Sequence, residues 1–280
     1  MRTIQALAAA TLALTISLSG GCYVYDDVEN PSFPVTELDA QADERRMRAD
    51  PKPVERPVLV IGGYRSPDPF IESMAITIAR MTTGDRDDFM RLAMWFEGDI
   101  EEAALETVEL VQATHPSDDP DETVEIDVVA MSMGGLVARY AADRLAKERP
   151  GARRLKINRL MTIATPHRGA LLAENTPIIE DRAVTDMYRS SLFLVKLEEA
   201  YKGDYEIIPY ARLNDGVVGT INTAPPGRTP IWVSGPVVGG SHLTINEDKR
   251  ILADIARRLR GEEPRGVEGE PLPPSEYGRR

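Results

Sequence analysis

A serine at a sharp turn between an apolar run and a helical pattern is the residue best placed for covalent chemistry. Residues 124–129 form a largely apolar, β-branched run, and Ser132 follows within the letters AMSMGGLVARY. A strand, a tight turn with a serine at its tip and a helix make up a nucleophile elbow. Strand and helix backbones approach closely there, so small residues are needed two places before and after the serine. Ala130 and Gly134 fill these positions.

The serine needs a base, because a hydroxyl is a weak nucleophile until its proton is removed. The sequence contains three histidines. His242, in the letters GGSHLTI, follows the last predicted strand and precedes the last predicted helix, and we predict it to be the general base. His167, in TPHRG, precedes every acid suited to the role. His115 stands at a helix end, where a cation is favourable.

Asp215 is the predicted acid that orients the base. It follows a predicted strand in the letters RLNDGVVG and lies upstream of His242, so the order along the chain is serine, acid, histidine. This order is known for triads built on parallel sheets. An Asn-Asp-Gly run is also a common turn signal, and a plain β-turn is the alternative interpretation.

Two backbone N–H groups are predicted to stabilise a developing oxyanion. One belongs to Met133, the residue after the nucleophile, and the other to the loop after the first predicted strand, IGGYR. Tyr64 is the first choice in that loop and Gly63 the second. The glycines are not part of a phosphate-binding pattern, and no HExxH or CxxC spacing suggests zinc. We therefore predict no metal and no cofactor.

Strands alternating with helices would position these residues. Predicted strands lie at 57–61, 89–96, 124–129 and 160–164 and within 205–219 and 229–242, and the predicted helices between them and after the last have amphipathic spacing. Such alternation favours a doubly wound, mostly parallel α/β sheet with right-handed crossovers. Residues 57–262 would form this domain. Residues 171–204 show helical patches without a strand pattern, which predicts a helical cap or lid.

The N-terminus has the pattern of an export signal. Residues 1–22 comprise an arginine, an apolar stretch and small residues ending at Cys22. The stretch is short for a membrane span. The letters LSGGC resemble a lipobox, so the expectation is a lipoprotein anchored in the cell envelope through a lipid on Cys22. The alternative is cleavage near residues 19–21, which yields a secreted or periplasmic protein.

Two polar segments flank the predicted domain. Residues 23–56 are rich in Asp, Glu, Arg and Pro, and residues 263–280 are rich in Pro, Gly and Glu. Neither shows apolar periodicity, so we predict a disordered tether and a disordered tail. The formal net charge of the chain is −12, and an acidic protein is a poor ligand for nucleic acids or anionic membrane surfaces. The sequence does not indicate an oligomeric state.

Taken together, the segments IGGY, AMSMGGLVARY, IATPHRGA, NDGVV and GSH resemble lipase-like α/β-hydrolases, including bacterial lipases and the inositol-deacylase-like group. The resemblance covers most of residues 57–260 and implies an α/β-hydrolase fold. It implies that Ser132 attacks an ester carbonyl, that His242 moves the proton and that Asp215 fixes the imidazole tautomer. Two departures from the family pattern are Ala130 in place of a glycine and Gly62 in place of a histidine.

The resulting functional hypothesis is a serine hydrolase that cleaves carboxylic esters, in the manner of an esterase or lipase, with a small-molecule or lipid ester as substrate. Acyl transfer or amide cleavage with the same triad is an alternative, because the pocket chooses the acceptor. A surface lipoprotein that binds a lipid or a partner without turnover is another. A binding module has no need of all three triad residues, which argues against the last hypothesis.

Overall fold

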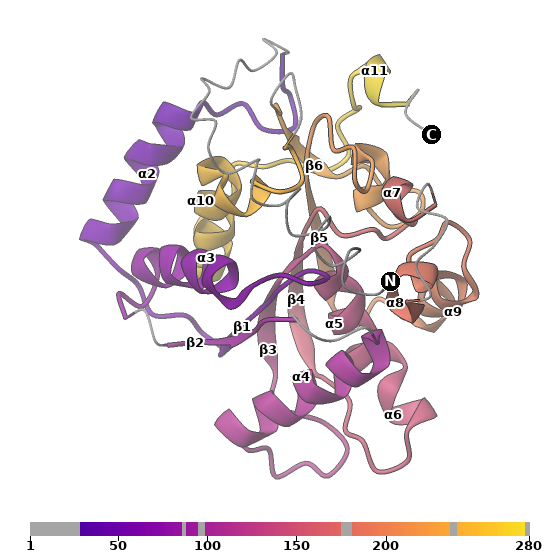
Figure 1. The fold of residues 1–280 in the computed structure, drawn as a ribbon. Helices are drawn as coiled ribbons and strands as arrows, with labels where there is room; N and C mark the ends of the chain where they lie inside the picture. The colour runs from indigo at the N-terminus through magenta and orange to yellow at the C-terminus, as the bar shows by residue number, and fades with distance from the viewer. Residues whose placement is uncertain (1–28, 86–87, 95–98, 175–180, 236–239, 278–280) are drawn as a thin grey trace, which may run out of the picture.

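A six-stranded parallel sheet forms the centre of the protein (Figure 1). The computed structural model describes residues 29–85, 88–94, 99–174, 181–235 and 240–277. The strand order is β2-β1-β3-β4-β5-β6. The strands are β1 (Val58–Ile61), β2 (Phe89–Leu92), β3 (Ile126–Met131), β4 (Ile157–Ile163), β5 (Glu206–Arg212) and β6 (Ile231–Val233). The strand order reverses between β1 and β3, and such a switch point opens a crevice at the carboxyl ends of the strands.

Helices cover both faces of the sheet (Figure 1). On one face lie α3 (Asp68–Met81) and α10 (Lys249–Leu259), and on the other lie α4 (Ile100–Thr114) and α5 (Met133–Asp143). The predicted fold class is therefore confirmed: this is the doubly wound α/β arrangement of the α/β-hydrolases. The short helix α6 (Leu145–Glu148) follows α5.

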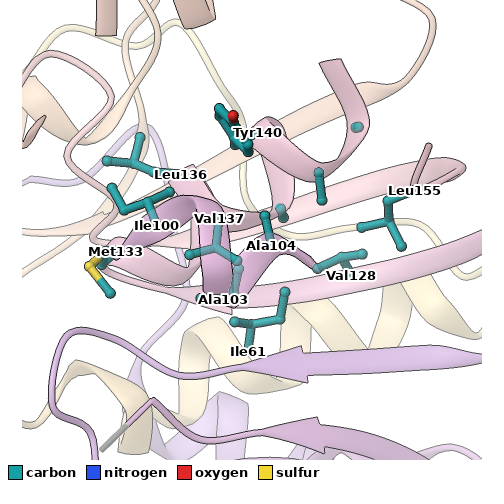
Figure 2. Packing of buried hydrophobic residues seen from close by; sticks show 14 of the residues in the cluster. Ile61, Ile100, Ala103, Ala104, Val128, Met133, Leu136, Val137, Tyr140 and Leu155 are labelled. Carbon is teal, nitrogen blue, oxygen red and sulfur yellow. The ribbon is translucent and has the colours of Figure 1, made fainter. Parts of the chain in front are cut away.

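Alternate side chains of each strand point to opposite faces, and this divides the core into two clusters. In β1, Leu59 and Ile61 belong to the cluster under α4 and α5, whereas Val58 and Val60 belong to the cluster under α3 and α10. Figure 2 shows the first cluster, in which Ile61 lies near Ala103 of α4. Because both faces are covered, apolar residues dominate the strands on both faces, and charged residues such as Asp127 of β3 and Arg159 of β4 are exceptions.

The predicted helical insertion lies between β4 and β5. Its described part contains α7 (Leu171–Glu174), α8 (Arg182–Asp186) and α9 (Leu192–Ala200). The α9 helix packs on α5, where the rings of Phe193 and Tyr140 stack with centroids 5.8 Å apart. Residues 175–180 lie outside the described residues.

The segment before β1 differs from the predicted disordered tether of residues 23–56. Residues 37–49 form the helix α2 (Glu37–Ala49), which begins with a capping box between Thr36 and Asp39. Its Met47 is fully buried in the cluster with α3 and α10. Ion pairs also connect α2 to the segment that follows α10, where Arg46 lies 2.5 Å from Glu262. The prediction of disorder was therefore wrong for residues 29–56.

The C-terminal segment also differs from the predicted disordered tail of residues 263–280. Residues 263–277 run along the edge strand β6 and end in the helical turn α11 (Pro274–Tyr277). Ser32 links both terminal segments to this edge: its Oγ donates to the Val267 carbonyl at 2.8 Å and accepts from the Trp232 amide at 3.0 Å. An edge strand exposes unpaired backbone groups, and here side chains of the N-terminal segment bond both backbone groups of Trp232, with Asn30 on its carbonyl and Ser32 on its amide. Residues 278–280 lie outside the described residues.

The predicted signal segment and Cys22 also fall outside the part of the chain that the structure describes, which begins at residue 29. Within that part, no helix combines the length and the apolar character needed to cross a lipid bilayer. The described residues also include two 3₁₀ turns, η1 (Thr220–Thr223) and η2 (Ile245–Glu247), which lie after β5 and after β6.

Candidate active site

The predicted nucleophile lies at a strained turn between β3 and α5. Ser132 has φ 51° and ψ −126°, a conformation that side-chain-bearing residues seldom adopt. Its amide donates to the Ile163 carbonyl at 2.8 Å, and its carbonyl accepts from Thr165 Oγ1 at 2.8 Å. Contacts with β4 and the loop after it therefore hold the turn in place, as a strained functional residue requires.

The small residues around the turn allow strand and helix to approach. A Cβ on Gly134 would lie 2.3 Å from the Gly62 carbonyl oxygen, so no larger residue fits there. A Cβ on Gly135 would meet Thr165 at 2.3 Å. Ala130, which departs from the usual glycine, is fully buried among the side chains of the α4 and α5 cluster, so this position accepts one methyl group.

The structure brings the three predicted triad residues together. His242 Nε2 lies 3.2 Å from Ser132 Oγ, and His242 Nδ1 lies 2.9 Å from Asp215 Oδ2. The other carboxylate oxygen, Asp215 Oδ1, accepts the backbone N–H groups of Val217 and Val218, each at 2.9 Å. All three side chains are buried, at exposures of 9% for the serine, 8% for the histidine and 0% for the acid.

These contacts fix the proton positions. Because Asp215 is an acceptor, His242 carries its proton on Nδ1 and presents the lone pair of Nε2 to the serine hydroxyl. Burial raises the pKa of Asp215, but the facing imidazole and the two amides outweigh burial, and the net pKa is below its ordinary value. Burial lowers the pKa of His242, but the Asp215 charge and hydrogen bond outweigh it, so the net pKa lies above 6.5.

The loop after β5 carries Asp215 and is called the acid loop, and the loop after β6 carries His242 and is called the histidine loop. The two loops are joined directly. Ser241 Oγ donates to the Leu213 carbonyl at 2.8 Å. The approach of the β5 and β6 ends is close, since a Cβ on Gly235 would lie 2.0 Å from that same carbonyl oxygen. Arg212, at the end of β5, pairs with buried Asp248 at 2.8 Å, just before α10. This buried ion pair ties the strand that leads to the acid to the helix that follows the histidine.

The loop after β1 lies against the nucleophile. A Cβ on Gly63 would be 2.9 Å from Ser132 Cβ. The Gly63 N–H, our second choice as an oxyanion donor, is engaged with Ser66 Oγ at 3.0 Å. Among the described residues, none accepts a hydrogen bond from the N–H of Tyr64 or Met133. The Tyr64 side chain reaches the insertion instead, where its hydroxyl donates to Asp181 at 2.5 Å.

His167 occupies a separate, structural position. Its Nδ1 lies 3.2 Å from Arg139 Nη1 and its Nε2 lies 3.1 Å from Thr162 Oγ1. Burial and the nearby arginines, Arg139 first among them, lower its pKa well below 6.5, so the ring is neutral. Arg139 continues to Glu198 of α9 at 2.9 Å. His167 thus connects the sheet, α5 and the insertion, and both its ring nitrogens are used in doing so.

Sequence reasoning missed two hydroxyls that support the site. Ser66 accepts the Gly63 N–H, and Thr165 donates to the Ser132 carbonyl. Both follow a strand of the sheet within a few residues, and Ser66 stands three places after Gly63, a spacing typical of turns. These positions in the sequence indicate residues near the site, but neither hydroxyl belongs to a recognisable motif.

Comparisons with known proteins agree with the fold. A family described as a domain of unknown function (DUF7379) matches residues 101–190, less than half of the chain. A comparison with curated proteins found no match. Among solved structures, the mature Bacillus licheniformis lipase BlEst2 is similar, with a TM-score of 0.50 and 12% identity, over 75% of this chain and 94% of that one.

Two further solved structures are similar to parts of the chain. The propeptide form of the same B. licheniformis lipase gives a TM-score of 0.51 at 12% identity, over 79% of this chain and 54% of that one. Phospholipase PlaB from Legionella pneumophila gives 0.47 at 10% identity, over 60% of this chain and 45% of that one. This chain therefore spans less than half of the PlaB chain. At these identities the similarity concerns the fold.

Proposed function

We propose that the protein is a serine hydrolase that cleaves carboxylic esters through an acyl-enzyme. The observation that carries the proposal is the buried hydrogen-bond chain from Asp215 through His242 to Ser132. Ser132 Oγ attacks the ester carbonyl while His242 Nε2 takes its proton, and the same proton then leaves with the alcohol. Water repeats the sequence on the acyl-serine, which releases the acid and restores the hydroxyl.

The proposed oxyanion site consists of two backbone groups. The Met133 N–H is at the first position of α5, where helix geometry leaves it without a partner inside the helix. The Tyr64 N–H is in the loop that lies against Ser132 and likewise has no acceptor among the described residues. Charge that develops on the substrate oxygen would be stabilised by two fixed donors in a largely buried setting.

An apolar ester is the proposed substrate class, either a small molecule or a lipid. Leu243, directly after the base, is 55% exposed, and Phe70, near the start of α3, is 48% exposed. Leu172 of α7 is 51% exposed. Exposed apolar side chains on the histidine loop, on α3 and on the insertion suit an acyl chain better than a charged substrate. The two similar B. licheniformis structures are of a lipase, which supports the same class.

Covalent labelling tests the function. We expect the purified protein to react with a fluorophosphonate probe, because the probe needs both a serine whose proton a neighbouring base can take and a formed oxyanion site. Loss of labelling in Ser132→Ala would identify the modified residue. A folded wild-type protein that stays unlabelled and hydrolyses no ester in an acyl-chain panel would overturn the proposal in favour of a binding protein.

We also propose that the protein is exported and anchored to a membrane through a lipid on Cys22. The support is the letters LSGGC at the end of an apolar segment. We expect Cys22→Ser to move the protein from the membrane fraction to the soluble fraction of the producing cells, because an acyl anchor supplies most of the membrane affinity. Fractionation with immunoblotting measures this, and Ser17→Ala, which changes the same segment but keeps the cysteine, is the matched control. Unchanged partitioning of Cys22→Ser would exclude the anchor.

A further inference from the structure

Glu276, near the end of the chain, is a buried carboxylate beside the loop that carries the catalytic acid. It belongs to the helical turn α11 and is only 2% exposed. Its Oε1 accepts the Asn214 N–H at 3.2 Å, and its Oε2 accepts the Thr220 hydroxyl at 2.5 Å. Asn214 immediately precedes Asp215, and Thr220 begins the turn η1 just after the acid loop. One side chain therefore holds both ends of the acid loop.

The backbone of the acid loop adopts conformations that need such support. Asn214 has φ 63°, in the left-handed region that L-residues seldom adopt. Gly219, at the other end of the loop, has φ 87°, and its N–H donates to the Asp215 carbonyl at 3.0 Å. Surrounding contacts must maintain a loop with two left-handed positions. Glu276 accepts the N–H of the first of these positions and the hydroxyl of Thr220, which directly follows the second.

A small apolar cluster places Glu276. Leu272 packs with Ala211 and Leu213 of the β5 end and with Trp232 of β6. Within the segment, the Leu272 N–H donates to the Tyr277 hydroxyl at 3.2 Å. The segment is thus fixed on the β5–β6 edge by burial, and α11 then directs the carboxylate toward the acid loop. None of the described lysines or arginines forms an ion pair with it.

We infer that Glu276 is a positioning residue of the active site, which acts by fixing the backbone on both sides of Asp215. The inference rests on the proposed function, since it assigns Asp215 as the acid of the triad. Burial of a carboxylate without a cationic partner destabilises a fold. The two hydrogen bonds that Glu276 accepts offset this cost and, at the same time, hold the acid loop. The C-terminal segment is in this way part of the catalytic unit.

Substitution of Glu276 tests the inference. We expect Glu276→Ala to lower kcat for an ester about ten- to hundredfold with little change in KM, because a displaced acid loop misorients the base without touching the substrate. We expect Glu276→Gln to recover most of the activity, since the amide oxygen can still accept the Asn214 N–H and the amide nitrogen can donate to Thr220. Thr220→Val removes one of the two contacts and should give an intermediate loss.

The matched control is Glu268→Ala in the same C-terminal segment. Glu268 pairs with Arg228 at 2.5 Å, outside the acid loop, so its loss should leave kcat within about twofold of wild type, as expected for a part-exposed ion pair. If Glu276→Ala is too unstable to assay, the Thr220→Val enzyme carries the test. Wild-type kcat in Glu276→Ala, or in Thr220→Val when only that variant can be assayed, would overturn the inference.

A measurement that needs no turnover separates this inference from the proposed function. The pKa of His242, followed by NMR titration of the imidazole, depends on the nearby Asp215 charge. We expect that pKa to fall in Glu276→Ala and to stay unchanged in Glu268→Ala. An inactive wild type in which Glu276→Ala still lowers the His242 pKa refutes the esterase proposal and keeps the positioning role. An active wild type with an unmoved pKa and an unchanged kcat refutes the positioning role alone.

Discussion

Replacement of Ser132 by alanine is expected to lower kcat for an ester substrate about 10⁶-fold, as the loss of a triad nucleophile does elsewhere. The acyl-enzyme cannot form without Oγ, and the remaining binding and oxyanion groups leave only a small residual rate. Steady-state hydrolysis of an activated ester, with product followed by absorbance, measures the loss. Active-site titration of the wild type supplies the enzyme concentration.

The same substitution should leave the fold intact. Ser132 precedes α5 without a side-chain cap, and its hydroxyl is hydrogen-bonded to His242. Alanine and serine both carry a Cβ, so the strain of this backbone conformation is about the same for either residue. We therefore expect the midpoint of thermal unfolding to stay within a few degrees of the wild type. Ser73→Ala, on the exposed side of α3, is the control and should keep full activity. Activity near the wild-type level in Ser132→Ala would refute the assignment of the nucleophile.

The sequence predicted the elements and residues that follow local rules. Each strand of the sheet contains an apolar run that is followed by a turn, and the loops after β3, β5 and β6 carry one triad residue each. Because parallel strands all deliver their carboxyl ends to one edge, the order of Ser132, Asp215 and His242 was enough to predict that they meet. The contact distances between them could come only from the structure.

The sequence did not predict the packing of the two terminal segments. Their charges suggested solvent exposure, yet Asp43 and Arg257 form an ion pair across 214 residues of sequence, and such a pairing has no local signature. The Thr36 and Asp39 positions of the capping box were a usable signal for α2, because a hydroxyl residue followed three places later by an acid marks a helix start. The polar composition of residues 23–56 indicates disorder, so the sequence analysis did not predict this helix.

Glu276 shows the same difficulty at the active site. The letters PSEYGRR have the composition of a disordered tail, and a single glutamate in them carries no motif. Its role depends on Leu272, which packs against Trp232 of β6. In the sequence these two residues are separated by the whole of α10. A contact of this kind is decided by tertiary packing, which overrides local propensity.

Alanine substitutions at the two buried histidines are expected to have opposite effects on activity and stability. His242→Ala should lower kcat by several orders of magnitude, because Ser132 then has no base and no proton donor for the leaving alcohol. His167→Ala should keep most of kcat in the folded enzyme but lower the free energy of unfolding by about 3 kcal/mol. The ring leaves a cavity, and its polar neighbours Arg139 and Thr162 lose a buried partner.

The pH dependence of the wild type gives an independent check on the same base. Catalysis needs His242 without its second proton, so kcat/KM should rise with pH and reach half of its plateau above pH 6.5, where the Asp215 charge places the pKa. His167 is neutral throughout this range because its pKa is far lower, so the His167→Ala enzyme should show the same midpoint as the wild type. A midpoint that moves in His167→Ala, together with a large loss of kcat there and a mild one in His242→Ala, would mean that the base is the histidine of TPHRG.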